Sequence, residues 1–124
     1  MILVTGAAGH IGNVLVRELL KDGEKVRALV LPGEDISSLH GLKIEICEGN
    51  VLDPVSLERA LRGIDYVYHL AGVISIMPGQ NELMRRVNVD GTLNVLAAAK
   101  KARVKRMVYT SSIHALSRDW KGKI

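Results

Sequence analysis

A glycine-rich turn between an apolar segment and an amphipathic segment constrains the fold of this chain more than any other feature. Residues 1–4 are apolar and predict a buried strand, and residues 5–12 then read Thr-Gly-Ala-Ala-Gly-His-Ile-Gly. From about residue 9 to residue 22 apolar residues recur at helical spacing, and Gly23 supplies a helix stop. The order strand, glycine turn, helix predicts the opening unit of a parallel α/β sheet.

Each glycine of this turn has a predicted role. Gly6 allows a sharp bend, Gly9 lets the backbone approach a pyrophosphate, and Gly12 lets the helix pack closely on the sheet. Free N–H groups and the positive helix end then face the phosphates. A P-loop needs Gly-Lys-Ser/Thr after four intervening residues, and position 11 is Ile, which excludes it. We therefore assign a dinucleotide to Gly6, Gly9, His10, Ile11 and Gly12.

Strand and helix patterns alternate along the rest of the chain. Further strands are predicted over residues 25–31, 43–48, 66–70 and 106–111, and helices over residues 54–62 and 81–102. The last helix is predicted to place Leu83, Val87, Gly91 and Val95 on one face. Five alternations without a repeat or linker predict one doubly wound, parallel α/β domain over residues 1–124.

Composition excludes several other classes of protein. The net charge is +4, but the main basic cluster ends a predicted helix, where cations favour the dipole, so we expect no nucleic-acid partner. RNA binding is the weakest alternative. The longest apolar run, residues 70–77, falls short of the roughly 20 residues that span a bilayer, so we expect no membrane partner. Cys47 is the only cysteine, which fits the cytoplasm, and no histidine spacing indicates a metal site.

Five motifs together resemble the extended short-chain dehydrogenases/reductases. The first is the spacing Thr-Gly-x-x-Gly-x-x-Gly of the turn. The others follow in the family's order and cover essentially the whole chain: Gly49-Asn50-Val51, His69-Leu70-Ala71-Gly72, Asn88-Val89-Asp90-Gly91-Thr92 and Val108-Tyr109-Thr110-Ser111-Ser112. The relatives implied are nucleotide-sugar epimerases/dehydratases and dihydroflavonol-reductase-like enzymes.

The resemblance implies an NAD(P)-binding Rossmann fold whose cofactor is NAD or NADP. It places Asn50 and Val51 beside the adenine, and it adds Leu70, Ala71 and Gly72 of the strand-end motif to the cofactor site. It also implies that the Ser112 hydroxyl, with Ser111 as a neighbouring candidate, positions a substrate oxygen, and that Asn88 organises this region. The family activity is hydride transfer, by an oxidoreductase or a sugar-nucleotide epimerase/dehydratase.

The Tyr-x-x-x-Lys pair that relays a proton in this family is missing from residues 1–124. In relatives the pair lies on the next helix, so we expect the domain to be incomplete relative to the family, without its C-terminal substrate region, and inactive alone. The alternative is a non-catalytic NAD(P)-binding sensor or protein-interaction module. The fifth strand is expected to be an exposed sheet edge, which predicts self-association.

The choice between NAD and NADP depends on the end of the second strand. The fold usually carries there an acid for the ribose hydroxyls or an Arg for a 2′-phosphate. By register these positions fall on Val30 and Leu31, and the missing acid slightly favours tolerance of NADP. Glu34 and Asp35 follow a Pro-Gly turn and are expected to be solvated loop acids.

Overall fold

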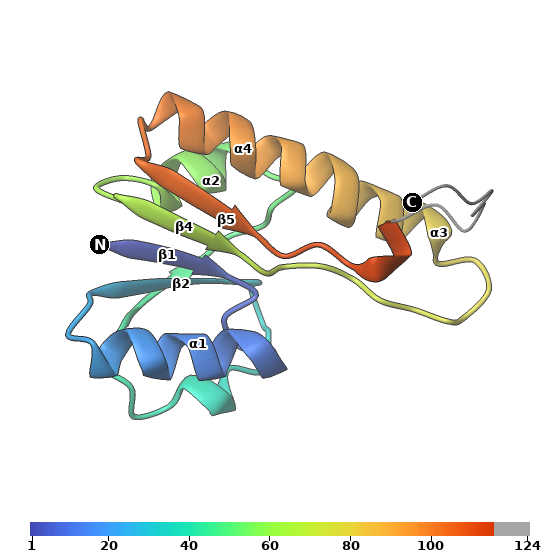
Figure 1. Ribbon diagram of the computed structural model, residues 1–124. Coiled ribbons are helices and arrows are strands. Elements are labelled where there is room, and N and C mark those ends of the chain that lie inside the picture. Colours follow the sequence, from blue (N-terminus) through green and yellow to red (C-terminus); the bar gives the residue numbers. More distant parts are fainter. Residues whose placement is uncertain (116–124) are drawn as a thin grey trace, which may run out of the picture.

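A computed structural model describes residues 1–115, which form one sheet of parallel strands with helices on both faces (Figure 1). The strand order is β3-β2-β1-β4-β5. The strands are β1 (Ile2–Thr5), β2 (Val26–Val30), β3 (Glu45–Glu48), β4 (Tyr66–His69) and β5 (Arg106–Tyr109). All four neighbouring pairs are parallel, which confirms the predicted doubly wound α/β class.

The helices connect consecutive strands and cover the two faces of the sheet. Helix α1 lies on one face, and helices α2 and α4 lie on the other (Figure 1). The helical elements are α1 (His10–Lys21), η1 (Ser37–Leu39), α2 (Pro54–Ala60), α3 (Asn81–Arg85), η2 (Arg86–Gly91), α4 (Thr92–Lys101) and η3 (Ile113–Ala115). The start of α2 follows its predicted signal, because the Asp53 side chain accepts the Val55 N–H at 3.0 Å.

Two apolar clusters hold these layers together, one on each face of the sheet. Val4 of β1 packs with Val16 of α1, whereas the preceding Leu3 packs with Leu57 of α2 and Val95 of α4. All five of these side chains are buried. Successive strand residues point to opposite faces, so the almost wholly apolar strand β1 is buried on both sides, as expected for the centre of a parallel sheet.

The predicted single helix over residues 81–102 is wrong in one respect. Helical backbone runs on from α3 to α4, but the connecting segment η2 is π-helical. Along the predicted apolar face the exposure falls from Leu83, which is 43% exposed, to Val95, which is fully buried. At Gly91 the chain runs close to Val51, since an added Cβ would lie 2.7 Å from Val51 Cγ2.

The chain reverses its order of strands between β1 and β4. From β1 it builds outwards through β2 to β3, and it then returns to β4 on the other side of β1. The loops after β1 and β4 therefore leave the sheet in opposite directions, which opens a crevice at the carboxyl ends of the strands. This edge of the sheet is where the glycine turn lies.

Candidate functional site: a cleft at the carboxyl ends of the strands

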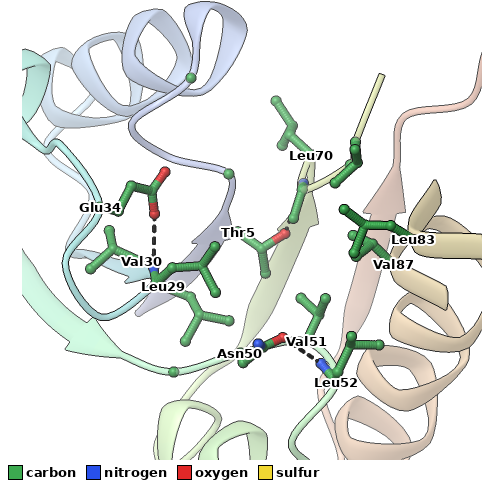
Figure 2. Close-up of a pocket in the computed structure, with 17 residues that line it drawn as sticks. Thr5, Leu29, Val30, Glu34, Asn50, Val51, Leu52, Leu70, Leu83 and Val87 are labelled. Carbon is green, nitrogen blue, oxygen red and sulfur yellow. Dashed lines mark hydrogen bonds between the residues drawn. The ribbon is translucent and has the colours of Figure 1, made fainter. Parts of the chain in front are cut away.

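A cleft of about 410 Å³ occupies this edge of the sheet (Figure 2). It is lined from the ends of β1, β2, β3 and β4 and by the apolar side chains of Leu83 and Val87. Seven predicted cofactor residues line it together: Gly6, Gly9, Asn50, Val51, Leu70, Ala71 and Gly72. Five other predicted site residues are not among its lining residues: His10, Ile11, Gly12, Asn88 and Ser112.

Gly6 and Gly12 shape the turn beneath the cleft. Gly6 has a φ of +68°, and an added Cβ would lie 2.8 Å from the Ala71 nitrogen. A Cβ on Gly12 would lie only 2.0 Å from the Gly6 carbonyl oxygen. The obstructing atoms belong to the backbone, which cannot move aside as a flexible side chain can. A side chain at either position would therefore force the turn to shift.

Gly9 differs from these two glycines because its conformation is ordinary. Its φ is −69°, and the nearest atom to an added Cβ would be the Gly6 carbonyl oxygen at 3.2 Å. It caps α1 without a side-chain hydrogen bond, and α1 has no acid in its first turn. Within residues 1–115, the backbone N–H groups of His10, Ile11 and Gly12 have no acceptor. These open donors and the helix dipole make the turn suited to bind an anion.

Asn50 and Val51 form the opposite end of the cleft, after β3. The Asn50 side-chain oxygen accepts the Leu52 N–H at 2.8 Å (Figure 2). The Asn50 N–H donates to the Ser56 hydroxyl at 3.0 Å. These bonds fix the loop and leave the Asn50 side-chain oxygen one further lone pair. The Val51 N–H has no acceptor within the described part of the chain. A ligand here thus meets a backbone donor beside a side-chain acceptor.

A buried hydrogen-bond chain behind the cleft was not anticipated from the sequence. The Thr5 hydroxyl lies 2.7 Å from His69 Nδ1 and accepts the Ala71 N–H at 3.1 Å. On the other side of the ring, His69 Nε2 lies 3.0 Å from the Thr92 hydroxyl, which donates to the Asn88 carbonyl at 2.8 Å. Since Thr92 uses its hydrogen on that carbonyl, its oxygen accepts from Nε2–H, and Nδ1 accepts from Thr5.

A neutral His69 ring provides the acceptor and the donor that this series of hydrogen bonds needs. Through Thr5 and Thr92 it links β1 and α4 to β4. The ring is fully buried and stacks on Tyr109 with ring centroids 5.6 Å apart. Burial lowers the pKa of His69 to about 4 from its usual 6.5. Protonation would turn Nδ1 into a donor and leave the Thr5 hydroxyl hydrogen without its acceptor.

We predict that His69 makes folding depend on pH between about 6.5 and 4. Its pKa is lower in the folded chain, so the unfolded chain binds more protons in this window and the free energy of unfolding falls as pH falls. Below pH 4 the free energy of unfolding is lower by about 3 kcal/mol. Above pH 6.5 His69 causes no loss of stability. Urea unfolding across this window measures it.

The control for this measurement is His69→Gln, which cannot titrate and should show a flatter pH dependence from a lower starting stability. The pKa of Asp65 is lowered to about 2 by its hydrogen bond with the N-terminal amine and by Lys105. Asp65 therefore changes the stability only at pH values below the window of His69. Equal slopes in the two proteins would contradict the assignment.

Asn88 holds the loop that follows β4. Its side-chain oxygen accepts the Val73 N–H at 2.8 Å, and its side-chain nitrogen donates to the Val73 carbonyl at 2.9 Å. These two bonds fix the backbone of Val73, which lines the cleft. Ser112 lies beyond the end of β5, and its carbonyl accepts the Ala115 N–H at 3.0 Å. The fifth strand was predicted to reach residue 111, but β5 ends two residues earlier, at Tyr109.

Two further findings bear on the class of site. Residues 1–115 contain no group of three or more His, Cys, Asp and Glu side chains placed to hold a metal ion. Over the same part of the chain, every helix is too short or too polar to cross a membrane.

The fold and the site together define a class of protein. A parallel sheet with a glycine turn at its switch point is the NAD(P)-binding Rossmann fold, and the motif order is that of the extended short-chain dehydrogenases/reductases. Residues 3–124 match the 3-beta hydroxysteroid dehydrogenase/isomerase family, and the chain belongs to that family. The resemblance read from the five motifs is confirmed.

Individual relatives are similar over nearly the whole chain. Sterol demethylase protein B of Methylococcus capsulatus is 44% identical over 92% of the chain and 35% of its own length. The crystal structure of gox2253 superposes with a TM-score of 0.87 at 36% identity, over 98% of the chain and 37% of its own length. A short-chain dehydrogenase/reductase superfamily protein from Agrobacterium tumefaciens, crystallised with NAD, superposes with a TM-score of 0.79 at 38% identity, over 90% of the chain and 32% of its own length. The chain spans about a third of the relatives it matches.

Proposed function

We propose that this chain is the NAD(P)-binding part of a reductase or epimerase of the short-chain dehydrogenase/reductase class. One observation carries the proposal: the open N–H groups at the start of α1 follow a turn whose Gly9 lines the cleft. A diphosphate supplies the negative charge and the acceptors that this turn lacks. The single Cys47 fits a location in the reducing cytoplasm.

The residues present fit a nicotinamide dinucleotide. The glycine turn would hold the linked phosphates, with Gly9 leaving room for their approach, and Asn50 and Val51 would receive the adenine edge. When bound, the cofactor supplies a hydride donor or acceptor. Leu70, Ala71 and Gly72 would line the passage towards the reacting end, where Ser112 orients the substrate oxygen and Asn88 keeps the loop in place.

Titration of NADH or NADPH into the folded chain, followed by cofactor fluorescence, tests the proposal. We expect a saturable change with at least one cofactor and no reductase turnover, because residues 1–124 contain no Tyr-x-x-x-Lys pair to relay the proton. Turnover by this polypeptide alone would contradict the second expectation. The alternative, a non-catalytic sensor, is less favoured, because the family and the relatives above are named for dehydrogenase and demethylase activities.

We also propose that this polypeptide self-associates through β5. That strand pairs with β4 along one edge, and no other strand within residues 1–115 pairs with its opposite edge. Val108 and Tyr109 are 43% and 48% exposed there. An open apolar strand edge is a template for another chain. In sedimentation velocity we expect the average mass to rise with concentration, and Val108→Lys, which charges the edge, to reduce the rise. A monomer at every concentration would contradict this proposal.

A further inference from the structure

The turn that carries the Val51 N–H is shaped by short-range hydrogen bonds. The Asn50 carbonyl accepts the Asp53 N–H at 2.9 Å, which closes a turn over residues 50–53, and the Ser56 hydroxyl lies 3.0 Å from the same carbonyl. These bonds fix the peptide group that joins Asn50 to Val51. They come from the turn itself and from the start of α2, so they set the shape of the turn but do not tie it to the other helices.

Asn94 of α4 ties this turn to a helix much further along the chain. Its side-chain nitrogen donates to the Val51 carbonyl at 3.1 Å, across 43 positions in the sequence. Among the hydrogen bonds within residues 1–115, it is the only one that links the turn to an element other than α2. Gly91 lies just before α4 and leaves room for the Val51 side chain, which is buried against it.

The bond from Asn94 fixes the second of the two peptide groups that flank Val51. The Val51 carbonyl belongs to the peptide group shared with Leu52, whose N–H donates to the Asn50 side-chain oxygen at 2.8 Å (Figure 2). With Asn94 on its carbonyl, this peptide group cannot rotate without breaking a hydrogen bond at each end. The Val51 N–H and the Asn50 side-chain oxygen are therefore held in one arrangement before any ligand binds.

We infer that Asn94 is a positioning residue for the cofactor and that, by holding Val51, it lets the chain distinguish adenine from hypoxanthine. The inference rests on the proposed function, which gives the adenine edge to Asn50 and Val51. Adenine presents an acceptor nitrogen beside an amino group that donates, whereas hypoxanthine presents an N–H beside a carbonyl. A fixed donor and acceptor reject the reversed pattern, and a turn that can tilt tolerates it. Asn94 acts from behind the cleft, since it is not among the lining residues.

Calorimetric titration of two dinucleotides into the folded chain tests the inference: whichever of NAD and NADP binds more tightly, and its hypoxanthine analogue. In the unsubstituted chain we expect the adenine form to bind roughly tenfold more tightly. Asn94→Leu, which keeps the size but removes the donor, should bring this ratio to about threefold or less, mainly by weakening the adenine form. Asn94→Asp should do the same, and its polar side chain keeps the test open if the leucine variant does not fold.

Lys101→Met is the matched control on the same helix. The Lys101 amine bonds the Glu58 carboxylate of α2 at 2.6 Å, so it also ties α4 to a neighbouring element, but neither residue lines the cleft. We expect this variant to keep the ratio of the unsubstituted chain. A change that only lowers stability weakens both dinucleotides in the same proportion, so the ratio separates positioning from a general structural effect.

Each outcome has a distinct meaning. Equal affinities for the two bases in the unsubstituted chain, or a ratio that both Asn94 variants leave unchanged, would overturn this inference and leave the proposed function intact. A ratio that Lys101→Met lowers as much as the Asn94 variants do would also overturn it. A chain that circular dichroism shows to be folded but that binds no dinucleotide would overturn both the inference and the proposed function.

Discussion

Gly12→Ala is expected to lower the free energy of unfolding by about 3 kcal/mol or more, the upper range for overpacking a close-packed site. The added methyl carbon would lie 2.0 Å from the Gly6 carbonyl oxygen and 2.8 Å from Ala7 Cα. Both atoms belong to the turn that joins β1 to α1, so relief requires α1 to move away from the sheet. Urea denaturation followed by circular dichroism measures the loss.

Gly9→Ala is the matched control for this prediction, because it makes the same chemical change three residues earlier in the same turn. Its methyl carbon would lie 3.2 Å from the Gly6 carbonyl oxygen, and its φ of −69° suits any residue. We expect Gly9→Ala to lower the free energy of unfolding by less than about 1 kcal/mol. If Gly12→Ala were as mild as Gly9→Ala, the close approach of α1 to the sheet would not depend on this glycine.

Gly9→Val is expected to weaken dinucleotide binding about 100-fold, which corresponds to about 2.7 kcal/mol, while the fold persists. The extended conformation at Gly9 accepts a β-branched residue. Its side chain would fill the space at the start of α1 that the proposed function gives to the phosphates. Calorimetry with the preferred cofactor measures the change in Kd.

Gly23→Ala provides the control for a loss of binding that follows only from lower stability. Gly23 has a φ of +79°, so alanine is strained there, but Gly23 does not line the cleft. We expect that variant to be less stable and to keep its affinity. Gly9→Val with unchanged affinity would show that the phosphates lie elsewhere.

Most of the fold was predictable because its signals are local. The apolar run of β1, the stop at Gly23 and the cap at Asp53 each act within a few residues, and the structure follows them. The π-helical segment η2 was not predictable from apolar spacing, because that spacing assumes a regular turn. Contacts from other elements matter there, such as the approach of Gly91 to Val51.

The site was predictable in part for the same reason. The glycine turn and the loop at Asn50 are encoded by neighbouring residues, and the structure brings them to one cleft. The bonds of His69 with Thr5 and Thr92 join residues 64 and 23 positions apart, which no local pattern records. Glu34 is solvent-exposed in its loop, as expected, but its bond with the Leu31 N–H was not foreseen, because that bond depends on the conformation of the Pro-Gly turn.

Isothermal titration calorimetry of NAD into the folded chain tests the central claim most directly. Open N–H groups at the glycine turn predict saturable binding of one dinucleotide per chain, with a Kd below about 1 mM. A sample that circular dichroism shows to be folded, yet that gives no heat with either NAD or NADP, would contradict the account.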